Sequence, residues 1–352
     1  MYSTICVHTP AKTGASILMI YTGGTLGMAY DANGQLKPFD FGQILQNLPE
    51  IDRFDFTLTV IAFDNPIDSS NVTPNHWIEW AQIIEQNYTL YDGFVILHGT
   101  DTMAYSASAL SFLLKGLNKP VIFTGAQLPI GSIRTDAREN MITALEIASA
   151  RNERNEPQVS EVCIYFHSRL LRGNRAKKVE STQFDAFYSE NYPPLAEAGI
   201  SIDFRPALMR PFVTEATLQV QNHMDDRVAI LKIFPGISRY VVESILNIPD
   251  LQAVVLETYG SGNAPTDTWF TECLSKAIQR GIVILNVSQC LGGTVLQGRY
   301  STSKHLLDIG VIGGGDITTE AAITKLMYLA GSGLSKTDWQ PLLTTSICGE
   351  MS

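Results

Sequence analysis

Two short stretches of the chain place threonine hydroxyls among glycines where an apolar run ends. Residues 21–28 are Tyr-Thr-Gly-Gly-Thr-Leu-Gly-Met after the run 16–21, and residues 98–105 are His-Gly-Thr-Asp-Thr-Met-Ala-Tyr after the run 93–97. Such apolar runs are typical of buried strands. In a parallel α/β sheet, ligand sites form at the carboxyl ends of the strands. The two stretches therefore predict paired loops at that edge, one carrying a nucleophile and the other the groups that orient it.

The chemistry expected of these loops is hydroxyl chemistry that uses no histidine. A threonine hydroxyl is a weak nucleophile at neutral pH and needs a base. Thr100 precedes Asp101, and Lys178 lies in the polar segment 169–178. A neutral Lys178 would accept the proton, although the Asp101 carboxylate favours the ammonium. Alternatively, Asp101 holds a substrate's α-ammonium while Lys178 and Thr100 relay the proton, and the residues alone leave both roles open.

The glycine amides of both turns are candidate oxyanion donors, each worth about 3 kcal/mol of the reaction barrier. Each residue singled out also has a purely structural explanation. The four threonines 22, 25, 100 and 102 suit helix N-caps, and Lys178 alone is typical of a solvated surface lysine. His98 is interpreted as a hydrogen-bonded core residue at a strand end. The run Asp68-Ser69-Ser70 alone is typical of a turn.

Several other catalytic classes lack their motifs in this sequence. There is no G-x-S-x-G nucleophile elbow, no H-E-x-x-H metal motif and no G-x-x-x-x-G-K-[ST] phosphate loop. The glycines at 23, 24 and 27 do not match the G-x-G-x-x-G spacing of a dinucleotide site, so a nucleotide-dependent oxidoreductase is disfavoured. The five scattered cysteines form no C-x-x-C pair. We therefore expect no metal site and no cofactor.

Size and charge narrow the class of protein further. A chain of 352 residues can hold two domains, and 45% hydrophobic with 17% charged residues is ordinary for a globular protein. The net charge of −10 argues against a nucleic-acid partner or an anionic membrane surface. No apolar run approaches membrane-spanning length, and residues 1–14 lack the apolar core of a signal peptide. With an odd number of unpaired cysteines, we expect a cytoplasmic protein.

The order of strand-like and helix-like segments predicts two α/β domains, the larger first. The first set of expected strands covers residues 16–21, 56–62, 93–98, 120–124 and 161–166. Its expected helices are 41–48, which Asp40 would cap, a helix that starts at Thr73-Pro74, and the helices 103–115 and 137–150. The second set has strands at 228–233, 253–257 and 282–287, and helices at 238–246, 268–280 and 319–329. The predicted domains are 1–205 and 227–352, joined by a linker over 206–226, and residues 1–14 are expected to be loose or weakly paired.

Taken together, the motifs resemble the bacterial L-asparaginase family, and most of all its cytoplasmic type I branch. The resemblance runs from about residue 16 to the C-terminus, and the two threonine motifs together are highly specific. The segments that carry it are 22–25 (Thr-Gly-Gly-Thr), 92–103, 119–127, 172–175 (Arg-Gly-Asn-Arg), 259–265 and 310–314.

The resemblance implies an amidohydrolase that converts L-asparagine to L-aspartate and ammonia through an acyl-enzyme. Thr25 would be the nucleophile, with Thr100, Asp101 and Lys178 as a second catalytic cluster. The substrate contacts that it implies are Asp68 and Ser69 at the amino-acid end, Gly99, the Ala126 backbone near the side-chain amide, and Asn263 from a partner subunit.

The resemblance also implies a flavodoxin-like parallel sheet in the larger domain and a smaller C-terminal parallel-sheet domain. The site would be closed by a neighbouring subunit, in a homotetramer built as a dimer of dimers. The family places a tyrosine on the loop after the first motif, whereas Gln35 stands at that spacing here and Tyr30 five residues earlier. We hypothesise that Tyr30 activates Thr25. Lys177 and Glu257 stand near Cys290 where the resemblance places a regulatory site, and their opposite charges could fill it, so regulation is not assumed.

Two neighbouring functions stay open beside asparagine hydrolysis. The first is the same chemistry on glutamine or on the amide of a charged tRNA, the latter disfavoured by the acidic balance. One methylene of substrate length changes binding by only about 1–3 kcal/mol, so glutamine activity is compatible with the site. The second is a non-catalytic amino-acid sensor. A sensor would not need Thr25, Thr100, Asp101 and Lys178 together, because binding alone requires neither two hydroxyls nor a base.

Overall fold

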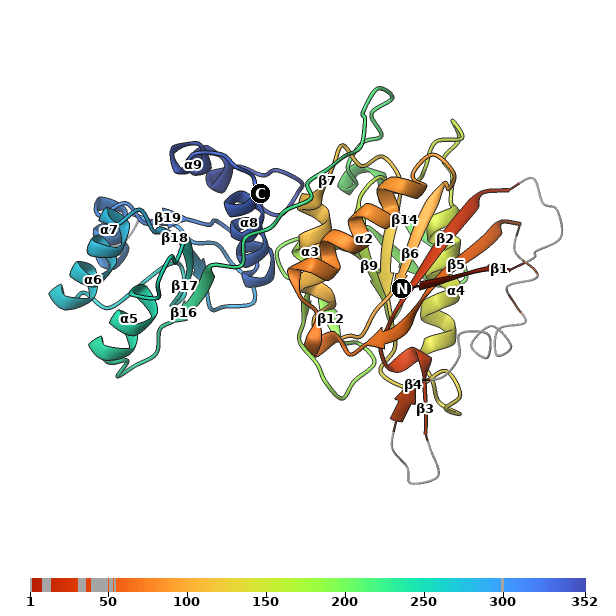
Figure 1. Ribbon diagram of the computed structural model, residues 1–352, viewed down its shortest axis with the longest axis horizontal. Helices are drawn as coiled ribbons and strands as arrows, with labels where there is room; N and C mark the ends of the chain where they lie inside the picture. Colours follow the sequence, from red (N-terminus) through yellow and green to blue (C-terminus); the bar gives the residue numbers. More distant parts are fainter. Residues whose placement is uncertain are drawn as a thin grey trace. The chain divides into compact units, whose positions relative to one another are not determined.

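The chain divides into two compact units, Met1–Val220 and Gln221–Ser352 (Figure 1). The computed structural model describes residues 2–7, 14–30, 36–38, 50, 53, 55–298 and 301–352. The helix expected over 41–48, its cap Asp40 and Gln35 lie outside the described residues.

Five parallel strands form the centre of the larger unit's sheet, and all five were expected from the sequence. They are β2 (Ser16–Gly23), β5 (Thr57–Ile67), β6 (Gly93–Leu97), β8 (Val121–Thr124) and β9 (Val162–Phe166). Their order across the sheet is β5-β2-β6-β8-β9. Numbered along the chain this is 2-1-3-4-5, the flavodoxin-like order, whose switch point lies between β2 and β6. The predicted fold class is confirmed.

Antiparallel strands extend this parallel core at both edges, so the sheet is mixed and has nine strands. β1 (Tyr2–Val7) pairs with β5, which gives the N-terminal lead-in a regular partner. On the other side follow β10 (Arg169–Arg172), β13 (Ala196–Ala198) and β14 (Ile202–Phe204). His167 and Ser168 link β9 to β10 with φ of 45° and 66°. Two positive φ values suit a two-residue hairpin turn, but histidine and serine are not the residue types from which such a turn is predicted.

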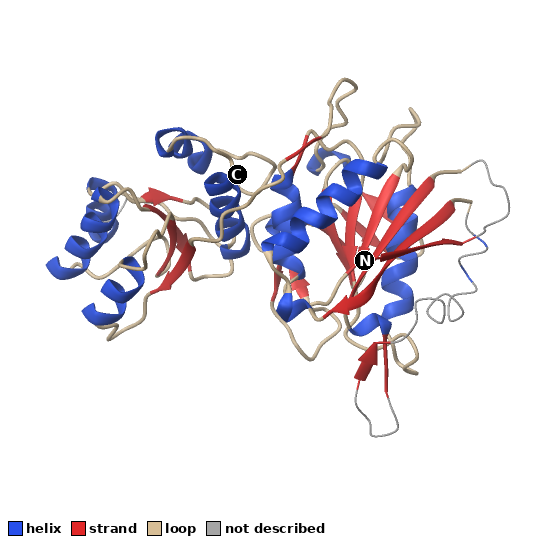
Figure 2. Cartoon of the chain, viewed as in Figure 1, coloured by secondary structure: helices blue, strands red, loops and turns tan. Residues whose placement is uncertain are grey.

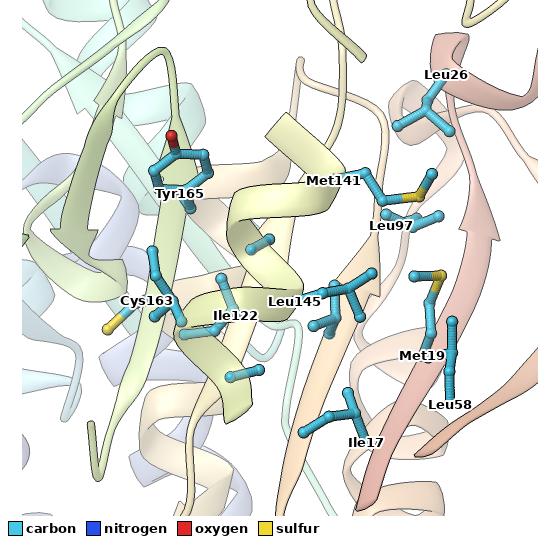
Figure 3. Packing of buried hydrophobic residues seen from close by; sticks show 14 of the residues in the cluster. Ile17, Met19, Leu26, Leu58, Leu97, Ile122, Met141, Leu145, Cys163 and Tyr165 are labelled. Atoms are coloured by element: carbon cyan, nitrogen blue, oxygen red, sulfur yellow. The ribbon is translucent and has the colours of Figure 1, made fainter. Parts of the chain in front are cut away.

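Helices cover both faces of this sheet (Figure 1). α4 (Ala137–Ser149) packs on one face, where Met141 and Leu145 meet strand residues such as Met19 (Figure 3). α2 (Pro74–Asn87) and α3 (Met103–Leu113) lie on the other side. α2 begins at the expected Thr73-Pro74 signal and buries the predicted apolar stripe Trp77, Trp80, Ile83 and Ile84. The strands are apolar on both sides because both faces are covered.

The smaller unit is a four-stranded, all-parallel sheet with helices around it (Figure 2). Its strands are β16 (Val228–Lys232), β17 (Ala253–Thr258), β18 (Val283–Ser288) and β19 (Ile312–Gly313). Its helices are α5 (Arg239–Leu246), α6 (Thr268–Gln279), α7 (Ser301–Asp308), α8 (Thr319–Gly331) and α9 (Lys336–Thr344). The sequence predicted all of these except β19, α7 and α9. α9 carries an internal proline, Pro341, which masks it as a helix.

The segment 206–226, expected to link the domains, is held against the larger unit over its first part. Arg172 Nη2 donates to Leu208 O at 2.9 Å. The Asn118 side chain accepts from Val213 N at 3.1 Å and donates to its carbonyl. β15 (Gln219–Val220) then pairs with β7 (Leu114–Lys115). The domain boundaries themselves stay a prediction.

Two further two-stranded sheets complete the larger unit. β3 (Met28–Tyr30) pairs with β4 (Leu36–Pro38), and β11 (Lys177–Lys178) pairs with β12 (Phe187–Tyr188). Among the described residues, every helix is too short or too polar to cross a lipid bilayer.

His98, at the end of β6, is a buried core residue, as interpreted from the sequence. Its Nδ1 lies 2.5 Å from Gly99 O, and a carbonyl only accepts, so Nδ1 carries the proton. Nε2 then accepts from Ser106 Oγ at 2.9 Å, and Ser106 accepts from Trp77 Nε1 at 2.9 Å. Burial lowers the pKa of His98 from 6.5 to about 4, despite the opposing hydrogen bond to Gly99. The imidazole is therefore neutral and joins α2 and α3 to β6.

This neutral histidine makes stability depend on pH. The unfolded chain binds a proton below pH 6.5 while the folded chain resists until about pH 4, so stability is full above 6.5 and falls as pH drops through this window. We expect a loss of about 3 kcal/mol in the free energy of unfolding, measured with urea at each pH. His98→Gln should lose this slope, and His223→Gln, at an exposed position, should keep it. An identical slope in His98→Gln would refute the assignment.

A second buried polar group fastens the C-terminal residues to α8. Lys325 and Glu350 are both fully buried and lie 2.6 Å apart. Lys325 also donates to Thr345 O at 2.9 Å, while Glu350 accepts from the backbone N–H groups of Ile347 and Cys348. Burial alone would raise the pKa of Glu350, but Lys325 and these backbone donors hold it below its ordinary value. The carboxylate is therefore charged and depends on its partner.

Removing only the lysine should leave the buried Glu350 carboxylate without its ion-pair partner. We expect Lys325→Met to lower the free energy of unfolding by about 3–5 kcal/mol, as for other broken buried pairs. The double variant Lys325→Met/Glu350→Gln should recover part of that loss, because no buried charge remains. Urea unfolding of the three proteins measures both effects. A single variant within about 1 kcal/mol of wild type would show that the pair contributes little.

Candidate active site

Four loops meet at the carboxyl ends of β2, β5, β6 and β8, and glycines allow their backbones to touch. A Cβ added to Gly24 would lie 2.5 Å from Gly99 N, and one on Gly99 would lie 2.6 Å from Ser69 Oγ. A Cβ on Gly125 would lie 2.3 Å from His98 O. Real side chains do not approach this closely. The glycines therefore bring the two threonine loops together at the switch point between β2 and β6.

The four threonines of these loops separate into two kinds. Thr22 Oγ1 donates to Leu97 O at 2.8 Å, and Thr102 Oγ1 donates to Ser69 O at 2.7 Å. These two hydroxyls tie neighbouring loops together. Thr102 does stand at the N-cap position of α3, as the helix-cap explanation expected, but its hydroxyl makes no capping hydrogen bond. Thr25 begins the 3₁₀ turn Thr25–Gly27 and is half-buried. Within the part of the chain that the structure describes, its hydroxyl makes no hydrogen bond.

Thr100 belongs to a separate cluster with Lys178 and Asp101. Lys178 Nζ donates to Thr100 Oγ1 at 2.8 Å and to Asp101 Oδ1 at 2.7 Å. Thr100 is 8% exposed and the Lys178 side chain 16%, whereas the Asp101 side chain is 67% exposed. The ion pair is therefore half open to water and adds little stability. The ion pair matters for geometry, because Asp101 holds the Lys178 ammonium within hydrogen-bond distance of the Thr100 hydroxyl.

Lys178 reaches this cluster because the chain leaves the sheet edge and passes closely over α3. After β10 the chain enters the 3₁₀ turn Gly173–Arg175, which packs against α3 and β9. A Cβ on Gly173 would lie 3.0 Å from both Ala107 Cβ and Val162 O. β11 follows at once, with Lys178 paired to Phe187 of β12. The close approach at Gly173 thus explains the glycine in the Arg-Gly-Asn-Arg motif.

Gln127 is a member of the cluster that we did not predict as a site residue. Thr100 Oγ1 donates to Gln127 Oε1 at 3.2 Å, and Gln127 Nε2 donates to Gln183 O at 3.0 Å. The signals in the sequence were its place at the end of segment 119–127, which carries the family resemblance, and beside Ala126, which is 2% exposed in the same loop. A glutamine in a loop after a strand carries no chemical signature by itself.

The predicted substrate contacts lie at different places in the fold. Asp68 precedes the turn Ser69–Asn71 after β5, and its exposed carboxylate accepts from Ser70 N at 2.9 Å and Ser70 Oγ at 2.8 Å. These hydrogen bonds, the backbone one first, lower the pKa of Asp68. Ser69 is buried beside Gly99. The loops after β2, β5, β6 and β8 thus bring Thr25, Ser69, Gly99 and Ala126 to one edge.

Three further residues belong to the smaller unit or have side chains that the structure does not describe. Asn263 belongs to the smaller unit, where its backbone closes a turn with Tyr259. Glu257 lies in that unit too, where it accepts from Thr319 at 2.6 Å and pairs with Lys232 at 3.4 Å. The Tyr30 backbone ends β3, and its side chain lies outside what the structure describes.

No group of three or more His, Cys, Asp or Glu suited to a metal ion occurs within the described residues. What the loops do offer is a half-buried threonine hydroxyl on one side and a hydroxyl–ammonium–carboxylate cluster on the other. A hydroxyl can attack a carbonyl, and an ammonium on a second hydroxyl can pass protons. This combination suits acyl transfer at a small polar substrate.

The close contact between the threonine loops can be tested at Gly24, whose φ is 92°. Gly24→Ala adds a methyl group against Gly99 N and strains the backbone, so the free energy of unfolding should fall by at least about 2 kcal/mol. Gly131→Ala is the matched control, since an added Cβ there meets nothing within 4 Å. Urea unfolding compares the two. Equal stability of both variants would contradict the contact.

Known proteins are similar to this chain over most of its length. Residues 16–210 match the family model "Asparaginase, N-terminal", and residues 227–343 match "Glutaminase/Asparaginase C-terminal domain". L-asparaginase 1 of Escherichia coli K12 is 42% identical over 339 residues, covering 96% of this chain and 98% of that protein. The structure of L-asparaginase I from Vibrio cholerae matches with a TM-score of 0.88 at 38% identity, covering 97% and 100% of the two chains.

The human 60 kDa lysophospholipase is also similar, at 38% identity over 359 residues. The match covers 96% of this chain but only 61% of that longer protein. Both predicted motif regions lie inside the N-terminal family match, and the two matches together span most of the residues. The chain belongs to the asparaginase family.

Proposed function

We propose that this protein hydrolyses L-asparagine to L-aspartate and ammonia through an acyl-enzyme on Thr25. The observation that carries the proposal is the Lys178 ammonium, placed 2.8 Å from Thr100 Oγ1 at the sheet edge where Thr25 lies. Two threonine hydroxyls and a proton carrier at one sheet edge suit amide cleavage better than binding alone. Membership of the asparaginase family, with relatives named L-asparaginase, supports the same substrate.

In the first half of the proposed reaction, Thr25 Oγ adds to the carboxamide carbon of asparagine. The hydroxyl proton passes to a base, for which Tyr30 is our hypothesis, and then to the leaving nitrogen. The C–N bond breaks, ammonia departs and an aspartyl ester forms on Thr25. Backbone groups of Gly99 and Ala126 are the proposed partners of the carboxamide, which they would stabilise as charge develops on its oxygen.

In the second half, water attacks the ester carbon and restores the Thr25 hydroxyl, so that L-aspartate leaves. We propose a proton relay in which Lys178 acts in its neutral form: the water proton passes to Thr100 Oγ1, the Thr100 proton passes to Lys178 Nζ, and a proton returns from this cluster to the leaving Thr25 oxygen. Asp101 would hold Lys178 in place or bind the substrate's α-ammonium. Asp68 and Ser69 would bind the amino-acid end. Asn263 of a partner subunit would complete the pocket. The half-exposed ion pair supports a proton carrier, since its position next to solvent gives the proton an exit.

The first experiment is ammonia release from L-asparagine by the purified protein. Thr25→Ala and Thr100→Ala should each lower kcat at least about 1,000-fold, because each removes a hydroxyl that forms or breaks a bond. Thr89→Ala is the matched control on an exposed turn and should behave as wild type. The kcat of Tyr30→Phe should fall in the same way if Tyr30 activates Thr25. Full activity of that variant would exclude this role for Tyr30.

Two outcomes would change the proposal. Comparable turnover of L-glutamine and L-asparagine would broaden it to a glutaminase-asparaginase. Tight binding of L-asparagine without ammonia release, in folded wild-type protein, would favour the amino-acid sensor instead. A cytoplasmic location and a homotetramer, built as a dimer of dimers, are further proposals. Light-scattering measurement of the mass in solution tests the assembly.

A further inference from the structure

The Gln127 amide can be oriented without ambiguity from its two partners. One end lies 3.0 Å from Gln183 O, and a backbone carbonyl only accepts, so that end is the Nε2 donor. The other end, Oε1, faces Thr100 Oγ1 at 3.2 Å. An amide oxygen accepts only, so the Thr100 hydroxyl is the donor in this contact. Gln127 therefore fixes where the proton of that hydroxyl points.

The same hydroxyl has a second partner that needs the opposite role. Lys178 Nζ donates to Thr100 Oγ1 at 2.8 Å, using an oxygen lone pair. In the resting arrangement, Thr100 thus gives its proton to Gln127 and offers its lone pair to Lys178. To give its proton to Lys178, the hydroxyl must turn away from Gln127. An ammonium cannot accept a proton, so Gln127 competes for the Thr100 proton only when Lys178 is neutral, and it holds the Thr100 oxygen within reach of the lysine.

Gln127 is itself held firmly by the start of α4. The Asp136 carboxylate accepts from Gln127 N at 3.1 and 3.0 Å and from Leu128 N at 3.1 Å. Asn140 Nδ2 donates to the same carboxylate at 3.3 Å and to Gly125 O at 3.0 Å. The loop after β8 is therefore anchored by charged and amide groups, so Gln127 has a rigid backbone from which to hold Thr100.

We propose that Gln127 is a positioning residue that sets the orientation and proton direction of the Thr100 hydroxyl relative to Lys178. This rests on the proposed function, since it acts through Thr100. Gln127 thus joins the cluster of Thr100, Lys178 and Asp101. It bridges the Thr100 loop to the segment after Lys178. The hydrogen bond to Gln183 holds the two segments together, and the hydrogen bond to Thr100 orients the hydroxyl for the proposed reaction.

Two substitutions separate these contacts. Gln127→Met keeps the length of the side chain and removes both hydrogen bonds. Its kcat should fall about fivefold with KM within about twofold of wild type, which corresponds to one lost neutral hydrogen bond. Gln86→Met makes the same exchange on the exposed face of α2 and should leave both constants unchanged.

Gln127→Glu keeps an acceptor for Thr100 but adds a carboxylate within about 6 Å of Lys178 Nζ. Lys178 and Asp101 face Thr100, and Asp136 faces the Gln127 backbone, so the new charge chiefly favours the Lys178 ammonium. The limb of the kcat/KM profile that rises with pH should move to higher pH, and the rate should recover there. Gln127→Met should show no such recovery.

A kcat for Gln127→Met within twofold of wild type would overturn the proposal, as would equal, pH-independent losses in both Gln127 variants. The latter result would mark a merely structural tether to Gln183. These outcomes require an active wild type that Thr100→Ala silences. Absence of ammonia release by wild type from any amide would instead defeat the proposed function, and this role of Gln127 with it.

Discussion

Backbone contact between loops is the constraint on which the site depends. Gly24 lies against the backbone of Gly99, and Gly99 lies against the Ser69 side chain, so the loops that follow β2, β6 and β5 approach closely only because these two residues are glycines. Thr22 and Thr102 then lock the contact through hydrogen bonds to backbone carbonyls. The flavodoxin-like strand order supplies the switch point where such loops diverge from the sheet. The close approach of these loops brings Thr25, Ser69 and Thr100 to one edge of the sheet.

Other elements of the larger unit hold these loops in place through hydrogen bonds. Neutral His98 ties β6 to both helices on one face, and Asp136 at the start of α4 ties down the loop after β8. Lys178 arrives from outside the parallel core, through the tight passage at Gly173. Its ammonium is the one element of the cluster that depends on the antiparallel extension of the sheet. The proposed catalytic cluster thus combines the edge of the parallel sheet with a part of the chain that follows the parallel strands.

Much of this was predictable because the relevant signals are local. The apolar runs gave the parallel strands, Thr73-Pro74 gave the start of α2, and the glycine and threonine loops gave the edge where the site forms. The β9–β10 turn was not predictable, because His167 and Ser168 adopt positive φ without being glycine or asparagine. Gln127 was missed because its function comes from two partners distant in sequence, and α9 because of its proline. Lys178 entered the cluster chiefly through family resemblance.

The central claim is that the first threonine loop carries the nucleophile and the second cluster carries protons. The most direct test is to quench the protein with acid while it turns over isotopically labelled L-asparagine, and to map the peptides by mass spectrometry. We expect an aspartyl ester on Thr25 and none on Thr100. An aspartyl group on Thr100, or no covalent adduct during sustained ammonia release, would contradict the central claim.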